Sequence, residues 1–261
     1  MSFMKYIISI IAFLLVSLSS NALTLDQRAD SAYAADDFTL AASLYEDIMQ
    51  TEGTSAALYY NLGNCWYRLD KPGKAIVAYE RALRIDPSNE NARINLEFVN
   101  SKIFDRQGER GSFLSNSYDR AATLMSSNTW AVTALILFFI LLGCIAIYIF
   151  ASAVRMRKLG FFGGIILFFA TICSAILAVR GANISSDNSF AIITSPSALL
   201  STSPREPKDR SEEAMLLHEG TKVEIKDSIS AQNDTTGLKW LDVQVDNNHR
   251  AWIKSSDVER I

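Results

Sequence analysis

The residue types that most often carry catalysis are scattered along this chain rather than grouped. Its two histidines, His218 and His249, are far apart, and no cysteine or histidine spacing typical of a zinc site is present. A phosphate-binding glycine loop and the nucleophile elbow of hydrolases are also missing from the sequence. We therefore expect a protein that is not an enzyme, with no catalytic residue, metal or cofactor, and we interpret both histidines as solvated.

The three cysteines do not form a disulfide framework. Cys65 lies within a helical pattern, whereas Cys144 and Cys173 lie in two separate apolar segments. If these segments pair as a hairpin, the two sulfurs lie at depths that differ by roughly 10 Å, and bridged Cα atoms must lie within about 7 Å. The sequence thus predicts three structural thiols.

The strongest functional signal is a pattern of small and aromatic residues between positions 56 and 89. It comprises Tyr59, Leu62, Gly63, Trp66, Ala75, Tyr79, Ala82 and Pro87. Gly63 and Ala75 are small where two antiparallel helices would cross, and Pro87 would end the second helix because it lacks an N–H group. The spacing resembles the tetratricopeptide repeat (TPR), a helical hairpin of about 34 residues. This resemblance implies a scaffold that binds protein segments.

In tetratricopeptide repeat proteins the first helix of each repeat lines a concave groove. The resemblance therefore implies that a set of mainly polar side chains lines such a groove in this chain. The candidate groove residues are Tyr60, Asn64, Tyr67, Arg68 and Asn95. Asn64 and Asn95 resemble the asparagines that hold a peptide backbone or a terminal carboxylate in some members. Tyr60 stands where such members carry a cation, which puts specificity for a terminal carboxylate in doubt. A merely solvated polar face is the alternative.

An all-α module is predicted over residues 23–104. Residues 23–55 form a degenerate first repeat, since Ala29, Ala41 and Tyr45 match the register of the full repeat, and residues 90–104 form a capping helix. Residues 105–128 are rich in Ser, Gly, Asn and Arg, and we interpret them as a tether.

Two apolar segments have the length of membrane-spanning helices, which need about 20 residues each. We place the spans at 129–154 and 159–179. Residues 155–158 between them contain three cations, which the positive-inside rule keeps in the cytoplasm. Residues 1–22 read as a signal peptide, with a retained anchor as the alternative. Both signals put the flanking modules on the exported side, so that a two-pass protein of the bacterial inner membrane is predicted.

Three glycines, Gly160, Gly163 and Gly164, gather near the start of the second span. Small residues let membrane helices approach closely, either within the hairpin or against another membrane protein. Neither span contains a charged residue, which argues against a transporter or proton relay.

After a linker at 180–188, residues 189–261 change to the two-residue alternation of β-strands. The strands around Phe190–Thr194, Trp240–Val245 and Ala251–Ile253 resemble those of a bacterial SH3-like domain, which is an all-β barrel. Trp240 and Trp252 are either core residues or the ligand face of this domain. Domains of this kind bind peptides or cell wall fragments.

The order of parts resembles the E-type protein of the aerotolerance (Bat) operon family: signal peptide, TPR module, two transmembrane helices and SH3-like domain. That resemblance implies a non-catalytic periplasmic scaffold linked to stress or oxygen tolerance, with sibling von Willebrand A-domain membrane proteins and a MoxR-type ATPase as partners. A peptidoglycan-binding membrane anchor is the alternative. With a net charge of −3 and no basic patch, nucleic acid is not an expected partner.

Overall fold

The computed structural model describes residues 24–105, 112–230 and 238–261, so the predicted signal peptide lies outside the described residues. The chain divides into two compact units, at Thr54 and Ser55. In the first unit, α2 (Leu25–Ala34) and α3 (Phe38–Thr51) form a helical pair with Ala29 and Ala41 fully buried. The Asp37 side chain caps α3 by accepting a hydrogen bond from the backbone N–H of Leu40.

The second unit begins with three helices, α4 (Ala56–Arg68), α5 (Pro72–Ile85) and α6 (Glu90–Asn100). Ser55 and Asn89 cap α4 and α6 with their side chains, and Pro72 opens α5, where an N–H group would have no helical partner. A Cβ atom on Gly63 would lie 2.6 Å from the ring of Tyr79. The close crossing of α4 and α5 that the sequence predicts therefore exists.

Part of the predicted tether is helical. Helix α7 (Phe113–Ala122) begins at Ser112, whose side chain accepts a hydrogen bond from the N–H of Ser115. The Asp119 carboxylate of α7 accepts a 2.6 Å hydrogen bond from Arg180 near the end of the second apolar helix. Composition alone suggested a flexible segment, and this long-range ion pair is invisible to composition.

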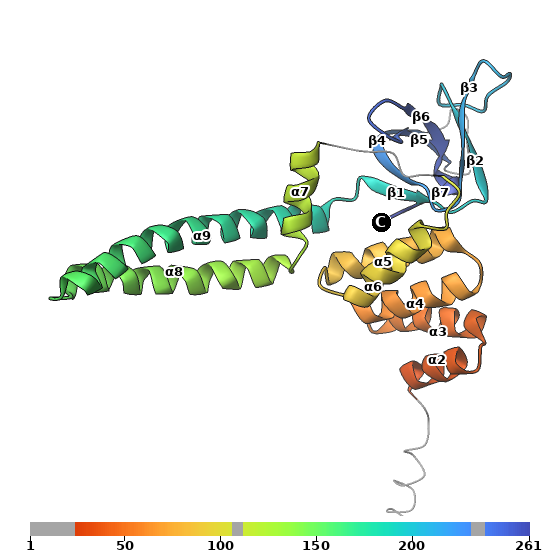
Figure 1. The fold of residues 1–261 in the computed structure, drawn as a ribbon. Helices are drawn as coiled ribbons and strands as arrows, with labels where there is room; N and C mark the ends of the chain where they lie inside the picture. The colour runs from red at the N-terminus through yellow and green to blue at the C-terminus, as the bar shows by residue number, and fades with distance from the viewer. Residues whose placement is uncertain (1–23, 106–111, 231–237) are drawn as a thin grey trace, which may run out of the picture. The chain divides into compact units, whose positions relative to one another are not determined.

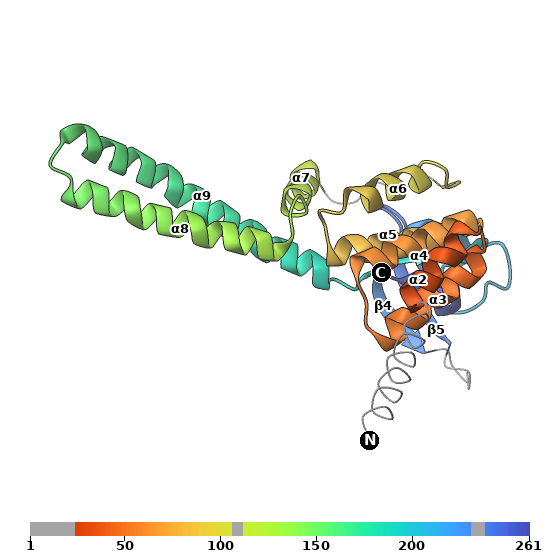
Figure 2. The same ribbon diagram turned by 90° about the horizontal axis from the view of Figure 1, so that it is seen from below.

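Helices α8 (Ser127–Phe150) and α9 (Val154–Ser186) run side by side as a hairpin (Figures 1 and 2). By length and composition both could cross a membrane. Their connection is residues 151–153, so the cations of the expected turn at 155–158 instead lie in the first turn of α9. Helix α9 also continues through most of the expected linker at 180–188, since Asn183 to Ser186 are still helical.

The C-terminal region is an antiparallel sheet with strand order β3-β2-β6-β5-β4-β1-β7 (Figure 1). The strands are β1 (Phe190–Ile193), β2 (Ser197–Ser201), β3 (Glu213–His218), β4 (Lys222–Ser230), β5 (Lys239–Gln244), β6 (Arg250–Lys254) and β7 (Val258–Arg260), with the short helix η1 (Ser255–Asp257) before β7. Among the described residues no pairing joins β3 to β7, so the sheet is open where we expected a closed barrel.

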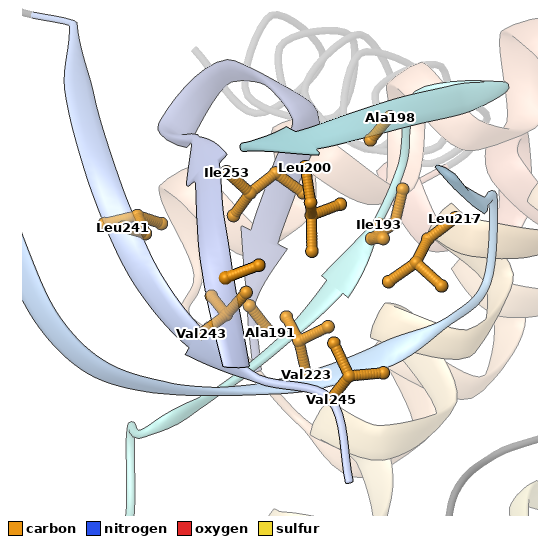
Figure 3. Packing of buried hydrophobic residues seen from close by; sticks show 11 residues of the cluster. Ala191, Ile193, Ala198, Leu200, Leu217, Val223, Leu241, Val243, Val245 and Ile253 are labelled. Atoms are coloured by element: carbon orange, nitrogen blue, oxygen red, sulfur yellow. The ribbon is translucent and has the colours of Figure 1, made fainter. Parts of the chain in front are cut away.

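One face of this sheet forms an apolar core. Leu200, Val223, Val243 and Ile253 come from four strands and point into the same interior (Figure 3). Each is fully buried, as the two-residue alternation of a strand with one covered face requires. The sheet therefore has its own core.

A second cluster joins the sheet to the helices of the same unit. Ile76 and Tyr79 of α5 pack with Ile192 of β1 and with Ile261, which follows β7. All four are buried. Helix α5 thus buries one face against α4 and α6 and another against the sheet.

Candidate functional site

A cleft opens between the end of α4, the start of α5 and the end of α6. Its volume is about 430 Å³, and it is lined by Tyr67, Arg68, Asp70, Pro72, Val99 and Lys102. Tyr67 and Arg68 belong to the groove set that the sequence predicts. The last turn of α4 places both side chains at its mouth.

Lys102 is one of two cations that line this cleft, the other being Arg68, and two aromatic rings flank Lys102. Its Nζ atom donates a 3.0 Å hydrogen bond to the Tyr67 hydroxyl and lies 4.1 Å from the centre of the Phe98 ring. The two rings meet edge to face with centroids 5.7 Å apart. Cation–π contact of this kind fixes the ammonium group without neutralising its charge. A carboxylate or carbonyl oxygen of a bound segment could therefore dock here.

Sequence reasoning missed Phe98 and Lys102. They lie three and seven residues after Asn95, which places all three on one side of α6 and its extension. This helical spacing was the available signal.

Asn64 and Asn95 have a bracing role. The Oδ1 atom of Asn64 accepts hydrogen bonds from the Tyr79 hydroxyl at 2.7 Å and from Nδ2 of Asn95 at 2.9 Å. These bonds tie together α4, α5 and α6. Tyr60, the fifth predicted residue, packs near Tyr79 with ring centroids 6.2 Å apart. The predicted set is thus divided between the cleft and its supporting framework.

The opposite side of α5 is occupied by the sheet through charged contacts. Glu80 pairs with Lys222 at 2.7 Å, and Arg81 pairs with Glu259 at 2.7 Å. The backbone N–H of Gly73 donates a 3.0 Å hydrogen bond to the carboxylate of Glu219. Burial raises the pKa of Glu219, against the opposing effect of this hydrogen bond.

A second contact joins the end of the helical module to the sheet. Asp105 accepts hydrogen bonds from the backbone N–H of His218 at 2.6 Å and from the Thr221 hydroxyl at 2.8 Å, and its other oxygen lies 3.1 Å from Nδ1 of His218. Burial would raise the pKa of Asp105, but the hydrogen bonds from His218 and Thr221 outweigh it and lower the pKa. His218 is therefore an interface residue rather than the solvated side chain that we expected.

The remaining sequence candidates lie elsewhere. Trp240 is only 4% exposed, whereas Trp252 is half-buried, so of the two only Trp252 offers surface to a ligand. Gly160, Gly163 and Gly164 all face α8, where a Cβ atom on Gly160 would lie 2.7 Å from the Cys144 carbonyl oxygen.

Among the described residues we find no nucleophilic or metal-binding site. Cys65 is fully buried, and burial raises the pKa of its thiol to about 12. Among the residues that the structure describes, no three His, Cys, Asp or Glu side chains gather closely enough to hold a metal ion.

Two antiparallel helices crossing at Gly63, with a third packed beside them, define a helical-repeat module. Residues 56–89 match the family model described as tetratricopeptide repeat, which confirms the repeat predicted at the same positions. A comparison with curated proteins found no match. The repeat indicates that protein partners are bound.

Proposed function

We propose that this protein is a non-catalytic, membrane-anchored scaffold that binds a segment of a partner protein in the cleft between α4 and α6. One observation carries the proposal: the cleft is open while the opposite side of α5 is covered by the chain's own sheet. The tetratricopeptide repeat at 56–89 supports a protein rather than a small molecule as the ligand.

The cleft favours a particular chemistry in the bound segment. Lys102 and Arg68 supply two positive charges against the one carboxylate of Asp70, and Phe98, which packs against Lys102 beside the cleft, supplies an apolar surface that is 47% exposed. A segment with an acidic side chain next to an apolar or aromatic one would satisfy both features. The charge gives specificity and the ring contributes burial.

Membrane topology follows from the hairpin and from the contacts between the modules. Because the sheet contacts α5 directly, the two modules must lie on the same side of any membrane that α8 and α9 cross. Arg155, Arg157 and Lys158 at the opposite end of the hairpin would stay in the cytoplasm under the positive-inside rule. We therefore place both modules in the periplasm, anchored to the inner membrane.

The resemblance to the E-type Bat protein extends this proposal to an envelope complex linked to stress or oxygen tolerance. It supplies sibling von Willebrand A-domain membrane proteins and a MoxR-type ATPase as candidate partners, and an SH3-like domain as the interpretation of the C-terminal sheet. The strand alternation and the apolar core of that sheet support the interpretation.

A detergent pull-down from native membranes tests the scaffold function. The chain carrying Phe98→Ala and Lys102→Gln should lose its partners, because Lys102 lines the cleft, Phe98 packs against Lys102, and both changes leave the Asn64 brace intact. A matched control, Leu216→Ala with Lys208→Gln, removes one apolar group from β3 and one cationic group from the loop between β2 and β3, and this variant should retain the partners. Equal partner recovery from both variants would contradict binding in the cleft.

A second candidate is peptidoglycan binding through the sheet. It is favoured by the exposed pair Leu199 and Leu216, which are directly opposite on β2 and β3, and by the accessible part of Trp252. For this candidate the expected results of the variants are exchanged. The full-length wild-type chain should sediment with purified sacculi, and the Leu216→Ala variant should sediment less. The variant with Phe98→Ala and Lys102→Gln should sediment like the wild type. Absence of sedimentation would eliminate this candidate.

A further inference from the structure

A second and larger cavity lies where the hairpin meets the two modules. Its volume is about 510 Å³, and its walls come from α5, α6, α7, α9 and strands β1 and β4. Nothing in the proposed scaffold function uses this cavity, and it is separate from the cleft that Tyr67 and Lys102 line.

The cavity lies at the depth of lipid headgroups if the hairpin crosses a membrane. Ser127, the first residue of α8, and Gly181, two residues after the apolar stretch of α9 ends at Val179, both line it. Trp130 lies near the start of α8, and a 3.2 Å hydrogen bond from its indole N–H to the Ala122 carbonyl fixes its ring there. Tryptophan is enriched at membrane–water interfaces.

Several charges in the cavity wall are already compensated. Arg180 is hydrogen-bonded through two nitrogens to Asp119, at 2.6 and 3.0 Å. Lys222 pairs with Glu80 at 2.7 Å. Each of these two ion pairs is close to neutral, so neither adds net charge to the cavity.

Three arginines in the wall, Arg84, Arg93 and Arg120, form no ion pair with a described carboxylate. Arg84 donates hydrogen bonds to Asn188 and to the Asp187 carbonyl, and the nearby Asp187 carboxylate offsets its charge, which leaves Arg93 and Arg120. Arg93 donates hydrogen bonds to the backbone carbonyls of Pro87 and Thr123, and Arg120 makes no ion pair with a described residue. Arginine guanidinium groups bind phosphate oxygens with paired, charge-assisted hydrogen bonds. The cavity therefore presents two positive charges suited to a phosphate ester.

Large apolar side chains are exposed on the helix that carries Arg120 and just after it. On α7, which carries Arg120, Phe113 and Leu114 are 83% and 78% exposed, and Leu124 just beyond the helix is 59% exposed. Helix α7 packs against α9, so these exposed side chains lie on a helix next to the hairpin, where acyl chains would cover them if the hairpin crosses a membrane. The phosphate group is thus expected to come attached to lipid tails.

We propose that this cavity binds the phosphate group of an anionic phospholipid, with Arg93 and Arg120 as its donors and α7 lying in the membrane interface. The proposal rests on membrane insertion of the hairpin, which is part of the proposed function. It does not depend on whether the α4–α6 cleft binds a partner.

The test measures lipid binding by the full-length chain, purified in detergent, with native mass spectrometry. Phosphatidylglycerol should bind more tightly than phosphatidylcholine, and Arg93→Gln with Arg120→Gln should weaken phosphatidylglycerol binding about tenfold or more, as the loss of charge-assisted hydrogen bonds predicts. Because Arg93 also joins two backbone segments, Arg120→Gln alone serves as a variant with no structural bond removed. The charge-matched control, Lys208→Gln with Arg210→Gln, should bind like the wild type.

Three results would overturn the assignment. Wild-type affinity for phosphatidylglycerol in both arginine variants would eliminate the site. Equal affinity for the two lipids in the wild type would eliminate recognition of an anionic headgroup. Protection against thermal unfolding by inorganic phosphate alone, equal to that by phosphatidylglycerol, would assign the cavity to a soluble phosphate. Carbonate extraction of the same variants from membranes checks insertion separately, so failure of the hairpin and failure of the cavity are distinguishable.

Discussion

The side-chain amide of Asn95 donates a 2.9 Å hydrogen bond to Oδ1 of Asn64, which also accepts the hydroxyl of Tyr79 at 2.7 Å. One carbonyl oxygen on α4 thus satisfies a donor from α5 and a donor from α6. Tyr79 is 1% exposed, so water cannot replace this acceptor for its hydroxyl without opening the helix pair. Residues that the sequence assigns to ligand binding consequently hold the cleft in shape.

Replacing Asn64 tests this bracing role. Asn64→Ala removes the acceptor of two partly buried donors and should lower the free energy of unfolding by about 1–3 kcal/mol. Asn64→Asp keeps an oxygen acceptor and should cost less. Thermal unfolding of the full-length chain in detergent, followed by circular dichroism, measures both. If the two variants unfold at the wild-type temperature, the hydrogen bonds do not contribute to stability.

The contact between the helical module and the sheet makes a prediction at Gly220. This residue has φ of +93°, and a Cβ atom there would lie 2.6 Å from Cγ2 of Ile103. Gly53 has φ of +98° with nothing within 4 Å of the same position. Both glycine-to-alanine changes cost roughly 1–2 kcal/mol in backbone strain. Gly220→Ala should cost a further 1–3 kcal/mol, approximately, from overpacking.

Unfolding curves measured separately for Gly220→Ala and Gly53→Ala give the difference between their losses in the free energy of unfolding. A larger loss for Gly220→Ala would show that Ile103 and the turn at Gly220 remain in contact in solution. Equal losses would show that the sheet and the end of the helical module are not held together there.

The sequence predicted those features that depend on local spacing. Gly63 and Tyr79 lie at fixed positions of a short repeat, so the close crossing of α4 and α5 could be expected from their sizes alone. The apolar lengths of α8 and α9 and the alternation in the strands around Trp240 are also local patterns. Each of these patterns involves only residues that are close together in the sequence, within a few helical turns or within one strand.

Features that depend on distant residues could not be predicted in this way. Asp105 contacts His218, which is 113 positions away, and no spacing rule relates the two. Arg180 holds Asp119 from a helix that composition assigned to the membrane and its linker. The same limit explains the candidate groove: the asparagines were chosen by position in a repeat, whereas their hydrogen bonds to each other depend on packing.

Glu219 gives a prediction about pH. Burial raises its pKa above the ordinary value of 4.5, so the folded chain favours the protonated carboxyl. The contribution of this group to stability is therefore fully present below pH 4.5 and is lost as the pH rises through the raised pKa. Glu219→Gln keeps an oxygen acceptor for the Gly73 N–H and removes the half-buried charge. It should raise the unfolding temperature at pH 7, and the gain should shrink towards pH 4.

Glu212 provides a control of opposite sign. A hydrogen bond from the backbone N–H of Lys208 is the main cause that lowers the pKa of this half-buried carboxyl. Glu212→Gln should therefore give no increase in unfolding temperature at pH 7. A decrease on Glu219→Gln at that pH would mean that the carboxylate of Glu219 stabilises the contact with α5 despite its burial.

The hairpin gives a prediction that separates packing from helix content. Gly160 lies so close to α8 that a Cβ atom would approach the Cys144 carbonyl oxygen to 2.7 Å and the Tyr148 nitrogen to 2.9 Å. Both are backbone atoms, so Gly160→Ala must move the helices apart and lose van der Waals contact along their interface. Gly143, within α8, has open space at the same position, and Gly143→Ala leaves the interface unchanged. In a titration of mixed micelles with sodium dodecyl sulfate, Gly160→Ala should lose its helical hairpin at a lower mole fraction of the denaturing detergent than the wild type, while Gly143→Ala should match the wild type. Identical midpoints for all three chains would show that α8 and α9 do not pack at Gly160 and that the glycines of α9 are free for contact with another membrane protein.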